Sequence, residues 1–519
     1  MRKWLIGLAV AALVIALGFV IALHVFVPEL CKMARERTQG YLASRFESTV
    51  QFSDFQVSLR PRLKLVLNGV VLRYEGRTDI PPLIEIRVVT IDAALSTLIS
   101  HHPEVAGVRL DGLRIHTPPH MPGGKPLIHG TDQNLAEKYP VVIREIRADD
   151  ALLVILRKPL DAGKPPHEFA IHELVMRDFN FSSPTSFHAV LTNPVPTGEI
   201  SCDGKFGPWQ ADDPSTTPVD AQYTFRNADM STLKGLSGTL SSDGKFSGPL
   251  DYLSVQGATD IPNFALRVSS HPMALHTDFN AIVDGTNGDV ILNNVIAHFL
   301  HTTLITKGKV VDENREVKGR TIVMDAISQA ARIEDLLLLA VKAEPPAMTG
   351  SAELKAHILI PEKNEDLIER LKIDAQFDVS NAEFTSDSVQ GKINGLSRRG
   401  QGQPKATDLG TAHSELTGAF KVGSGQVTFS RLQFQVPGAS INLSGSYNMD
   451  GGQMDFRGRL RLQAKLSQTV TGAKSFFLRA LNPFLKGKDG VGTELPIKIT
   501  GTKGNPSFGL DFHDKTNRE

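Results

Sequence analysis

Cysteine is nearly absent from this chain, which limits the redox and metal chemistry that the sequence can support. Among its 519 residues there are two cysteines, Cys31 and Cys202. Their spacing matches neither a CxxC redox pair nor a zinc-ligand pattern. We expect two unpaired thiols. A disulfide is the less favoured alternative, because it would require the fold to bring the two residues together.

Charge of either sign is not in excess. Lysine and arginine total 56, and aspartate and glutamate also total 56, so the formal net charge is zero. Proteins that bind nucleic acid usually carry a basic surplus. The sequence therefore predicts no nucleic-acid partner.

The chain also lacks the short motifs of common enzyme classes. It contains no P-loop, no GxSxG and no HExxH. His298 and His301 have an HxxH spacing, but in a strand their rings would point to opposite faces. His101 and His102 precede a proline in a polar connection. We therefore predict that the protein is not an enzyme and that it binds no metal and no cofactor.

Long hydrophobic runs are missing everywhere except at the N-terminus. The run from Trp4 to Val27 has His24 as its only ionisable residue, and as a helix it would reach about 36 Å, enough to cross a hydrocarbon core of roughly 30 Å. We predict an uncleaved anchor; the alternative is a cleaved signal peptide, whose apolar run is usually shorter. Arg2 and Lys3 precede the run, which favours a large C-terminal part across the membrane. The predicted anchor residues are Trp4, Leu5, Ile6, Leu13, Ile15, Leu17, Phe19, Ile21 and Phe26.

What the chain does have is alternation, clearest from Met454 to Leu466. Apolar residues occupy one parity of this stretch, and most of the other parity is charged. Because a strand places alternate side chains on opposite faces, the stretch is predicted to be a ribbon of roughly 40 Å with one apolar and one charged side. Its basic residues are interpreted as a solvated outer face: Arg457, Arg459, Arg461 and Lys465.

Turn signals divide the alternating stretches. Asn68-Gly69, Asp111-Gly112 and Asp149-Asp150 each interrupt an apolar pattern and predict hairpins of two short strands. A change of parity near Ser430 and Arg431 predicts a β-bulge.

Two stretches have helical patterns. The range 327–341 is predicted to be a helix that covers one end of a sheet, and Pro345-Pro346 ends it. The range 471–486 is predicted to be an amphipathic helix, either a cap or a membrane-surface helix. We divide the chain into an anchor (1–30), a β-region (31–325), a helical insertion or cap (326–374) and a C-terminal β-region (375–519).

Three stretches resemble the AsmA-like family of bacterial membrane-anchored proteins. They are VSLRPRLKLVLNGVVL (57–72) with VAGVRLDGLRIHTPP (105–119), the segment from 255 to 290, and the segment from 440 to 508. The resemblance implies a single-pass protein of the bacterial inner membrane whose bulk is periplasmic, related to bridge-like lipid-transfer proteins with a long apolar groove. It implies no catalytic residues.

The expected fold is mainly β: an N-terminal transmembrane helix, then an elongated, curled antiparallel sheet that forms an apolar groove, with a few short capping helices. If about 20 to 25 strands stacked at roughly 4.8 Å, the groove would be about 100 to 120 Å long. Such a groove would bind acyl chains of phospholipid or another envelope lipid and contribute to lipid transport between the inner and outer membranes. The alternative is a structural factor with a closed β-sandwich core that assists outer-membrane assembly through a protein partner. The candidate groove residues are Leu63, Leu65, Leu67, Phe429, Ile441, Leu443, Met454, Phe456, Leu460, Leu462 and Leu466.

Overall fold

The computed structural model describes most of the chain beyond residue 47. The described ranges are 48–58, 62–74, 78, 81–82, 84–94, 104–117, 142–155, 167–180, 183–208, 210, 216–285, 288–312, 320–362, 365, 367–406, 410–449, 452–465, 492–502 and 505–511. The predicted anchor, the predicted helix at 471–486 and Leu466 lie outside these ranges. Among the described residues, no helix combines the length and apolarity needed to cross a membrane.

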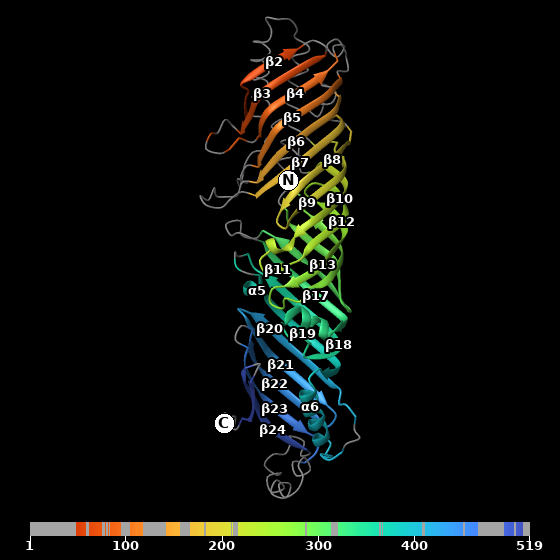
Figure 1. Cartoon of the computed structure of the whole chain (residues 1–519), viewed down its shortest axis with the longest axis vertical. Helices are drawn as coiled ribbons and strands as arrows, with labels where there is room; N and C mark the ends of the chain where they lie inside the picture. Colours follow the sequence, from red (N-terminus) through yellow and green to blue (C-terminus); the bar gives the residue numbers. More distant parts are fainter. Residues whose placement is uncertain are drawn as a thin grey trace.

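Strands make up 71% of the described structure (Figure 1). The first strands are β1 (Ser48–Gln51), β2 (Asp54–Ser58), β3 (Leu63–Tyr74), β4 (Ile84–Ala93), β5 (Glu104–Thr117), β6 (Val142–Ile155), β7 (His167–Phe179), β8 (Thr185–Pro194) and β9 (Thr197–Phe206). The central strands are β10 (Pro218–Asp229), β11 (Leu236–Ser237), β12 (Thr239–Pro249), β13 (Leu253–Leu266), β14 (Met273–Val283), β15 (Val290–Phe299), β16 (Thr302–Val311) and β17 (Thr321–Arg332). The last are β18 (Met348–Ile360), β19 (Lys372–Phe384), β20 (Ser414–Gly423), β21 (Gln426–Val436), β22 (Ala439–Asn448), β23 (Gln453–Leu462), β24 (Thr493–Thr502) and β25 (Asn505–Leu510). The helices are η3 (Met230–Thr232), α4 (Ile333–Ala340), α5 (Leu367–Arg370) and α6 (Asp387–Gly400).

All of these strands belong to one 25-stranded sheet in which most neighbours in sequence pair with one another. The exceptions are β1 and β2, which both pair with β3, and the short β11, which pairs with β13 while β10 pairs with β12. Figure 1 shows the strands stacked obliquely along the long axis of the molecule, from β2 and β3 at one end to β24 at the other. The sheet is curled and unclosed: no pairing joins β25 to β1, β2 or β3 within the described residues. The expectation of an elongated, curled sheet is confirmed, and the alternative of two sheets packed as a sandwich is wrong for this part of the chain.

The sheet departs from a purely antiparallel pattern at one place. β5 and β6 pair in parallel, with Val108 opposite Ile146 and Leu110 opposite Ala148. The other strand pairs among the described residues are antiparallel, as expected. Because a parallel pair needs a crossover rather than a tight turn, the connection between β5 and β6 is long.

The three hairpins predicted from turn signals are wrong. Gly69, Gly112 and Asp150 have φ values of +60°, +66° and +54°, as turn residues do, yet they lie inside the single strands β3, β5 and β6. Left-handed backbone kinks a strand without ending it when neighbours on both sides keep their hydrogen bonds. The turn chemistry therefore marks bends in the sheet.

Register shifts recur across the sheet and explain its curl. One lies between Phe429 and Leu432 on β21, so the bulge predicted near Ser430 and Arg431 is confirmed. Others occur on β10, β13, β15, β17, β18 and β19. Each bulge bends its strand and increases the local twist, so a series of them curves the whole sheet.

The fully buried core lies mainly in β3–β9. Val89, Ile91, Leu110 and Ile146 are 0% exposed and belong to one continuous cluster that also reaches Leu253 of β13. Complete burial at adjacent register positions makes this end of the sheet the main source of hydrophobic stabilisation.

Two helices pack at strand ends. α4 begins at Ile333, later than the predicted start at 327, because Ile327 still belongs to β17. Its Ile333 and Leu336 pack on a small cluster that contains Ala331 and Ala352. The range 326–374, expected to be a helical insertion, also contains all of β18, which continues the sheet on both sides.

α6 was not expected from the sequence. Its Ile393 and Leu396 pack against Val436, Ala439 and Leu462, at the ends of β21, β22 and β23. β23 itself ends at Leu462, so the alternating strand is shorter than the predicted span to Leu466.

Candidate functional site: the apolar face of the sheet

One row of register partners crosses almost the whole sheet. Each member lies opposite the next on the neighbouring strand, and directly opposed residues share a face of a sheet. This central row takes one residue from each of β3–β10 and β12–β24: Leu67, Val89, Leu110, Ala148, Leu174, Ala189, Cys202, Tyr223, Gly244, Gly257, Phe279, Val295, Thr306, Ala326, Ala356, Ala375, Phe420, Phe429, Gly445, Phe456 and Ile499.

A second row runs beside it on the same face and through the same strands. This flanking row consists of Leu65, Ile91, Val108, Ile146, Met176, Phe187, Gly204, Ala221, Phe246, Val255, Ala281, Leu292, Gly308, Met324, Ile358, Ile373, Val422, Val427, Tyr447, Met454 and Gly501. Charged residues make up 22% of the chain, yet neither row contains one. The two rows define what we call the apolar face.

Exposure changes along the apolar face. In the central row, the residues from Val89 to Ala189 are at most 5% exposed. From Cys202 onward the row is mostly half-buried, and in the flanking row every position from Leu292 to Met454 is half-buried. Beyond β8, therefore, much of the apolar face has no complete cover from the part of the chain that the structure describes.

Phenylalanines line the C-terminal part of this face. Ring centroids are 6.0 Å apart for Phe377 and Phe420, 5.6 Å for Phe420 and Phe429, and 5.8 Å for Phe429 and Phe456. The last pair bridges β22, where the central row has Gly445. These are favourable aromatic separations, and the rings form a nearly continuous apolar strip across β19–β23.

The described groove candidates all lie on this side of the sheet. Leu67, Phe429 and Phe456 belong to the central row, and Leu65 and Met454 to the flanking row. Leu63 and Leu65 are 3% and 4% exposed, so they belong to the closed core. Ile441, Leu443 and Leu460 are half-buried, whereas Leu462 is 8% exposed and lies beneath α6.

On the opposite face of β23, the basic side chains form ion pairs with neighbouring carboxylates, which the interpretation as a solvated basic row did not include. Arg459 and Arg461 both bind the carboxylate of Glu494 on β24, with N–O distances of 2.6 and 3.1 Å. Arg457 approaches Asp455 at 3.5 Å and Asp511 at 3.7 Å. Burial of the Glu494 carboxylate opposes ionisation, but the bonds from the two arginines prevail and lower its pKa. Sequence reasoning missed this pairing because Glu494 lies on a strand more than thirty residues away.

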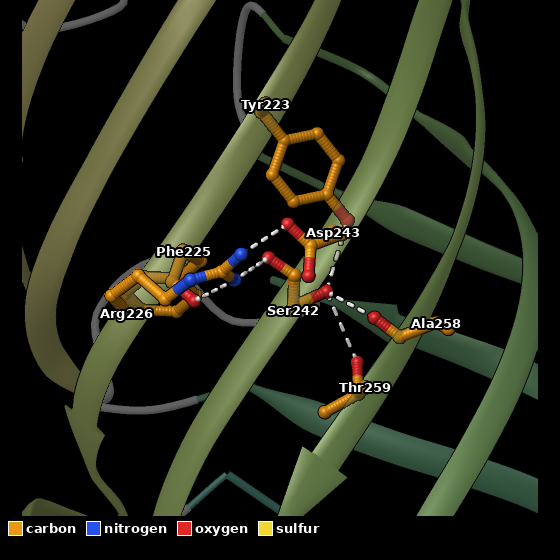
Figure 2. A network of polar contacts seen from close by, with 7 residues as sticks. All are labelled: Tyr223, Phe225, Arg226, Ser242, Asp243, Ala258 and Thr259. Carbon is orange, nitrogen blue, oxygen red and sulfur yellow. Dashed lines mark hydrogen bonds and ion pairs between the residues drawn. The ribbon is translucent and has the colours of Figure 1, made fainter.

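A hydroxyl cluster interrupts the apolar face at β10–β13 (Figure 2). The Ser242 side chain is 6% exposed, and its Oγ donates a hydrogen bond of 2.9 Å to the carbonyl oxygen of Ala258. The Thr259 Oγ1 lies 3.1 Å from the same Oγ, and the Tyr223 Oη lies 3.2 Å from it. Burial raises the pKa of Tyr223, which keeps the phenol neutral.

The possible metal ligands in the described part of the chain form no metal-binding group, and the thiol of Cys202 stays protonated. No group of three or more histidine, cysteine and carboxylate side chains is arranged to hold a metal. Cys202 is a free thiol whose pKa is raised to about 11, first by burial and then by the nearby Asp203 carboxylate. The His298 Nδ1 forms a hydrogen bond with the Thr303 Oγ1, and the His298 ring stacks on that of His276.

No protein-family model matches the chain, and no curated protein or solved structure matches it significantly. The functional argument therefore depends on the geometry of the apolar face.

Proposed function

We infer that the protein binds lipid acyl chains along its apolar face and contributes to moving lipid between the inner and outer membranes of a bacterial envelope. The observation that carries this inference is the pair of uncharged rows, which are mostly half-buried from β9 to β23. Soluble proteins rarely expose a contiguous apolar surface beyond a few hundred Å² without a ligand, membrane or partner to cover it. An acyl chain would provide such a cover, because its surface consists of apolar methylene groups.

The energetics favour both binding and movement. Burial contributes roughly 0.8 kcal/mol per methylene, so a sixteen-carbon chain would gain on the order of 10 kcal/mol. The gain is non-directional, so a shift from one strand to the next exchanges equivalent contacts. At about 4.8 Å per strand, the half-buried section from β9 to β24 would offer roughly 70 Å of such surface.

The membrane location is part of the same proposal. The apolar run at 4–27 would hold the chain in the inner membrane, with the sheet in the periplasm. The sequence resemblance to the AsmA-like family supports this arrangement. The protein acts without catalysis, cofactor or metal, and its partner is phospholipid or another envelope lipid.

Site-specific photocrosslinking in cells tests the proposal. A photoreactive phenylalanine analogue replaces Phe429, which lies on the apolar face between two other rings. The matched control places the same analogue at the adjacent, exposed Thr428. Crosslinking to lipid at 429 and not at 428 supports the proposal. Lipid crosslinks that are equal at both positions, or crosslinks at 429 to a single membrane protein instead of lipid, would contradict it.

A further inference from the structure

The hydroxyl cluster has a defined hydrogen-bond direction. Ser242 has one hydroxyl proton, and that proton is committed to the Ala258 carbonyl, which can only accept. Tyr223 and Thr259 must therefore donate their own protons to the Ser242 Oγ. Their oxygens keep lone pairs but have no proton left to offer.

A third hydroxyl lies beside them with its proton uncommitted. Thr277 is opposite Thr259 in the register of β13 and β14, on the same face and half-buried. Its hydroxyl has no hydrogen-bond partner within the described residues. The cluster thus presents acceptors from Tyr223 and Thr259 and, one strand further on, a group that can donate.

The surroundings exclude a charged ligand group. Arg226, the cation beside the cluster, has its guanidinium bound to Asp243 and to the carbonyl oxygens of Phe225 and Ser242 (Figure 2). An anionic phosphate would meet the lone pairs of Tyr223 and Thr259 without a free counter-charge. A neutral hydroxyl both donates and accepts, which matches what the cluster offers.

Two glycines and a phenylalanine define the place of the Tyr223 ring. A methyl group added at Gly244 would come within 2.9 Å of the Tyr223 Oη, and one at Gly257 within 3.0 Å. The absence of side chains at these two positions lets the Tyr223 ring lie against the sheet. Phe246 approaches the same ring, with centroids 6.4 Å apart. A fixed polar group with apolar positions on both sides suits a ligand that has a polar end and an acyl chain.

We propose that Tyr223, Thr259 and Thr277 form a binding station for the hydroxyl group of a neutral lipid whose chain lies on the apolar face. This rests on the proposed function, because the chain must be held there for its hydroxyl to reach the cluster. The station lies on β10, β13 and β14, in the section where the central row is mostly half-buried. A hydrogen bond there fixes the position of a chain that would otherwise slide.

Matched probes of equal carbon number test the station. Decan-1-ol and its isomer nonyl methyl ether have the same number of carbon atoms and differ in whether the oxygen carries a proton, and decyl phosphate adds charge. Binding to the full chain in mild detergent is measured by equilibrium dialysis, with detergent alone as the blank. Because one hydrogen bond contributes about 1 kcal/mol net, the alcohol should bind about fivefold more tightly than the ether. The phosphate should bind more weakly than the alcohol.

Variants locate the effect. The double variant Tyr223→Phe with Thr259→Val should bring the alcohol-to-ether ratio close to one while changing ether affinity little. Thr277→Val, which leaves every bond to Ser242 intact, should also lower the ratio and serves if the double variant is unstable. Tyr252→Phe makes the same chemical change at an exposed position outside the two rows and should leave the ratio unaltered.

The outcomes separate the two proposals. Equal binding of alcohol and ether to the unaltered chain overturns the station but leaves acyl-chain binding intact. A preference that survives the variants at 223, 259 and 277, or that disappears in Tyr252→Phe, overturns the station as well. Failure of all three probes to bind contradicts the proposed function itself.

Discussion

A carboxylate at Leu443 should weaken lipid binding far more than it destabilises the fold. Leu443 is half-buried on β22, between Leu432 and Gly458 in the register. Full burial of a leucine contributes about 1.5–3 kcal/mol, so the loss of a half-buried one should cost about 1 kcal/mol. The new carboxylate remains within reach of water, so the large penalty for burying a charge does not apply.

The free energy of ligand binding should fall by more than the free energy of unfolding. An acyl segment that crosses Leu443 and its two neighbours would lose contact for about three methylenes, or roughly 2.4 kcal/mol. That corresponds to binding about fiftyfold weaker. Ser444→Glu is the matched control, since Ser444 is the next residue, exposed on the other face and opposite Arg457.

Two measurements are needed on the unaltered chain, Leu443→Glu and Ser444→Glu. Native mass spectrometry of the full chain after gentle extraction gives the lipid retained per molecule, and urea unfolding gives the free energy of unfolding. The reasoning fails if Leu443→Glu retains as much lipid as the control. It also fails if this variant loses more than about 4 kcal/mol of stability, a size that indicates a closed core.

Three further predictions concern the fold. Gly458→Ala should destabilise the protein by several kcal/mol, because the added methyl would overlap a backbone carbonyl of β22. Gly395→Ala has no atom within 4 Å of the added methyl and lies in a helix, so it should stabilise the protein by about 0.5–1 kcal/mol. Urea unfolding of both variants checks this. The lowered pKa of Glu494 means that its contribution is present above its unfolded pKa of about 4.5 and is lost as pH falls through the folded pKa. Urea unfolding from pH 7 to pH 3 should therefore show a smaller acid loss for Glu494→Gln, and an identical loss would contradict the pairing. Cys202, with a pKa of about 11, should resist iodoacetamide at pH 8 until urea unfolds the chain, as peptide mass mapping would show; fast labelling of the native protein would disprove its burial.

Local patterns predicted the faces of the strands well. In β23 the parity of Met454, Phe456 and Leu460 alone assigned them to one side, because alternation within a strand is a property of consecutive residues. The bulge near Ser430 was visible for the same reason. α6 carried a weaker signal, Val389, Ile393 and Leu396 at helical spacing, in a segment diluted by Gly391 and Gly395.

The wrong hairpins show where local signals fail. Gly69 and Gly112 have the positive φ that turn glycines adopt, but partner strands on both sides hold β3 and β5 together through the kink. A window of sequence does not contain those partners. The parallel pairing of β5 with β6 was hidden in the same way, since it depends on a crossover rather than on either strand.

Sequence reasoning placed its groove candidates on the apolar face, but the continuity of that face and the hydroxyl cluster were beyond it for a related reason. The two rows exist only through register, which each strand pair sets by itself and bulges reset. The hydroxyl cluster joins Tyr223 to Ser242, 19 residues away, and Ser242 to Thr259, 17 residues away. In the sequence these are ordinary strand residues of three different segments.

The apolar alternation serves two purposes along one sheet, and a charge scan should separate them. In β4 and β5, Val89 and Leu110 are 0% exposed, so their side chains already have complete partners and contribute stability. Val89→Glu would bury an unpaired carboxylate, and we expect it to abolish cooperative unfolding or to cost more than about 4 kcal/mol. Beyond β8 the same apolar character is left half-covered, which adds less stability and leaves surface for a chain. If Val89→Glu and Leu443→Glu destabilised the protein equally in urea, the two ends would be alike, and the half-buried rows would be an ordinary core.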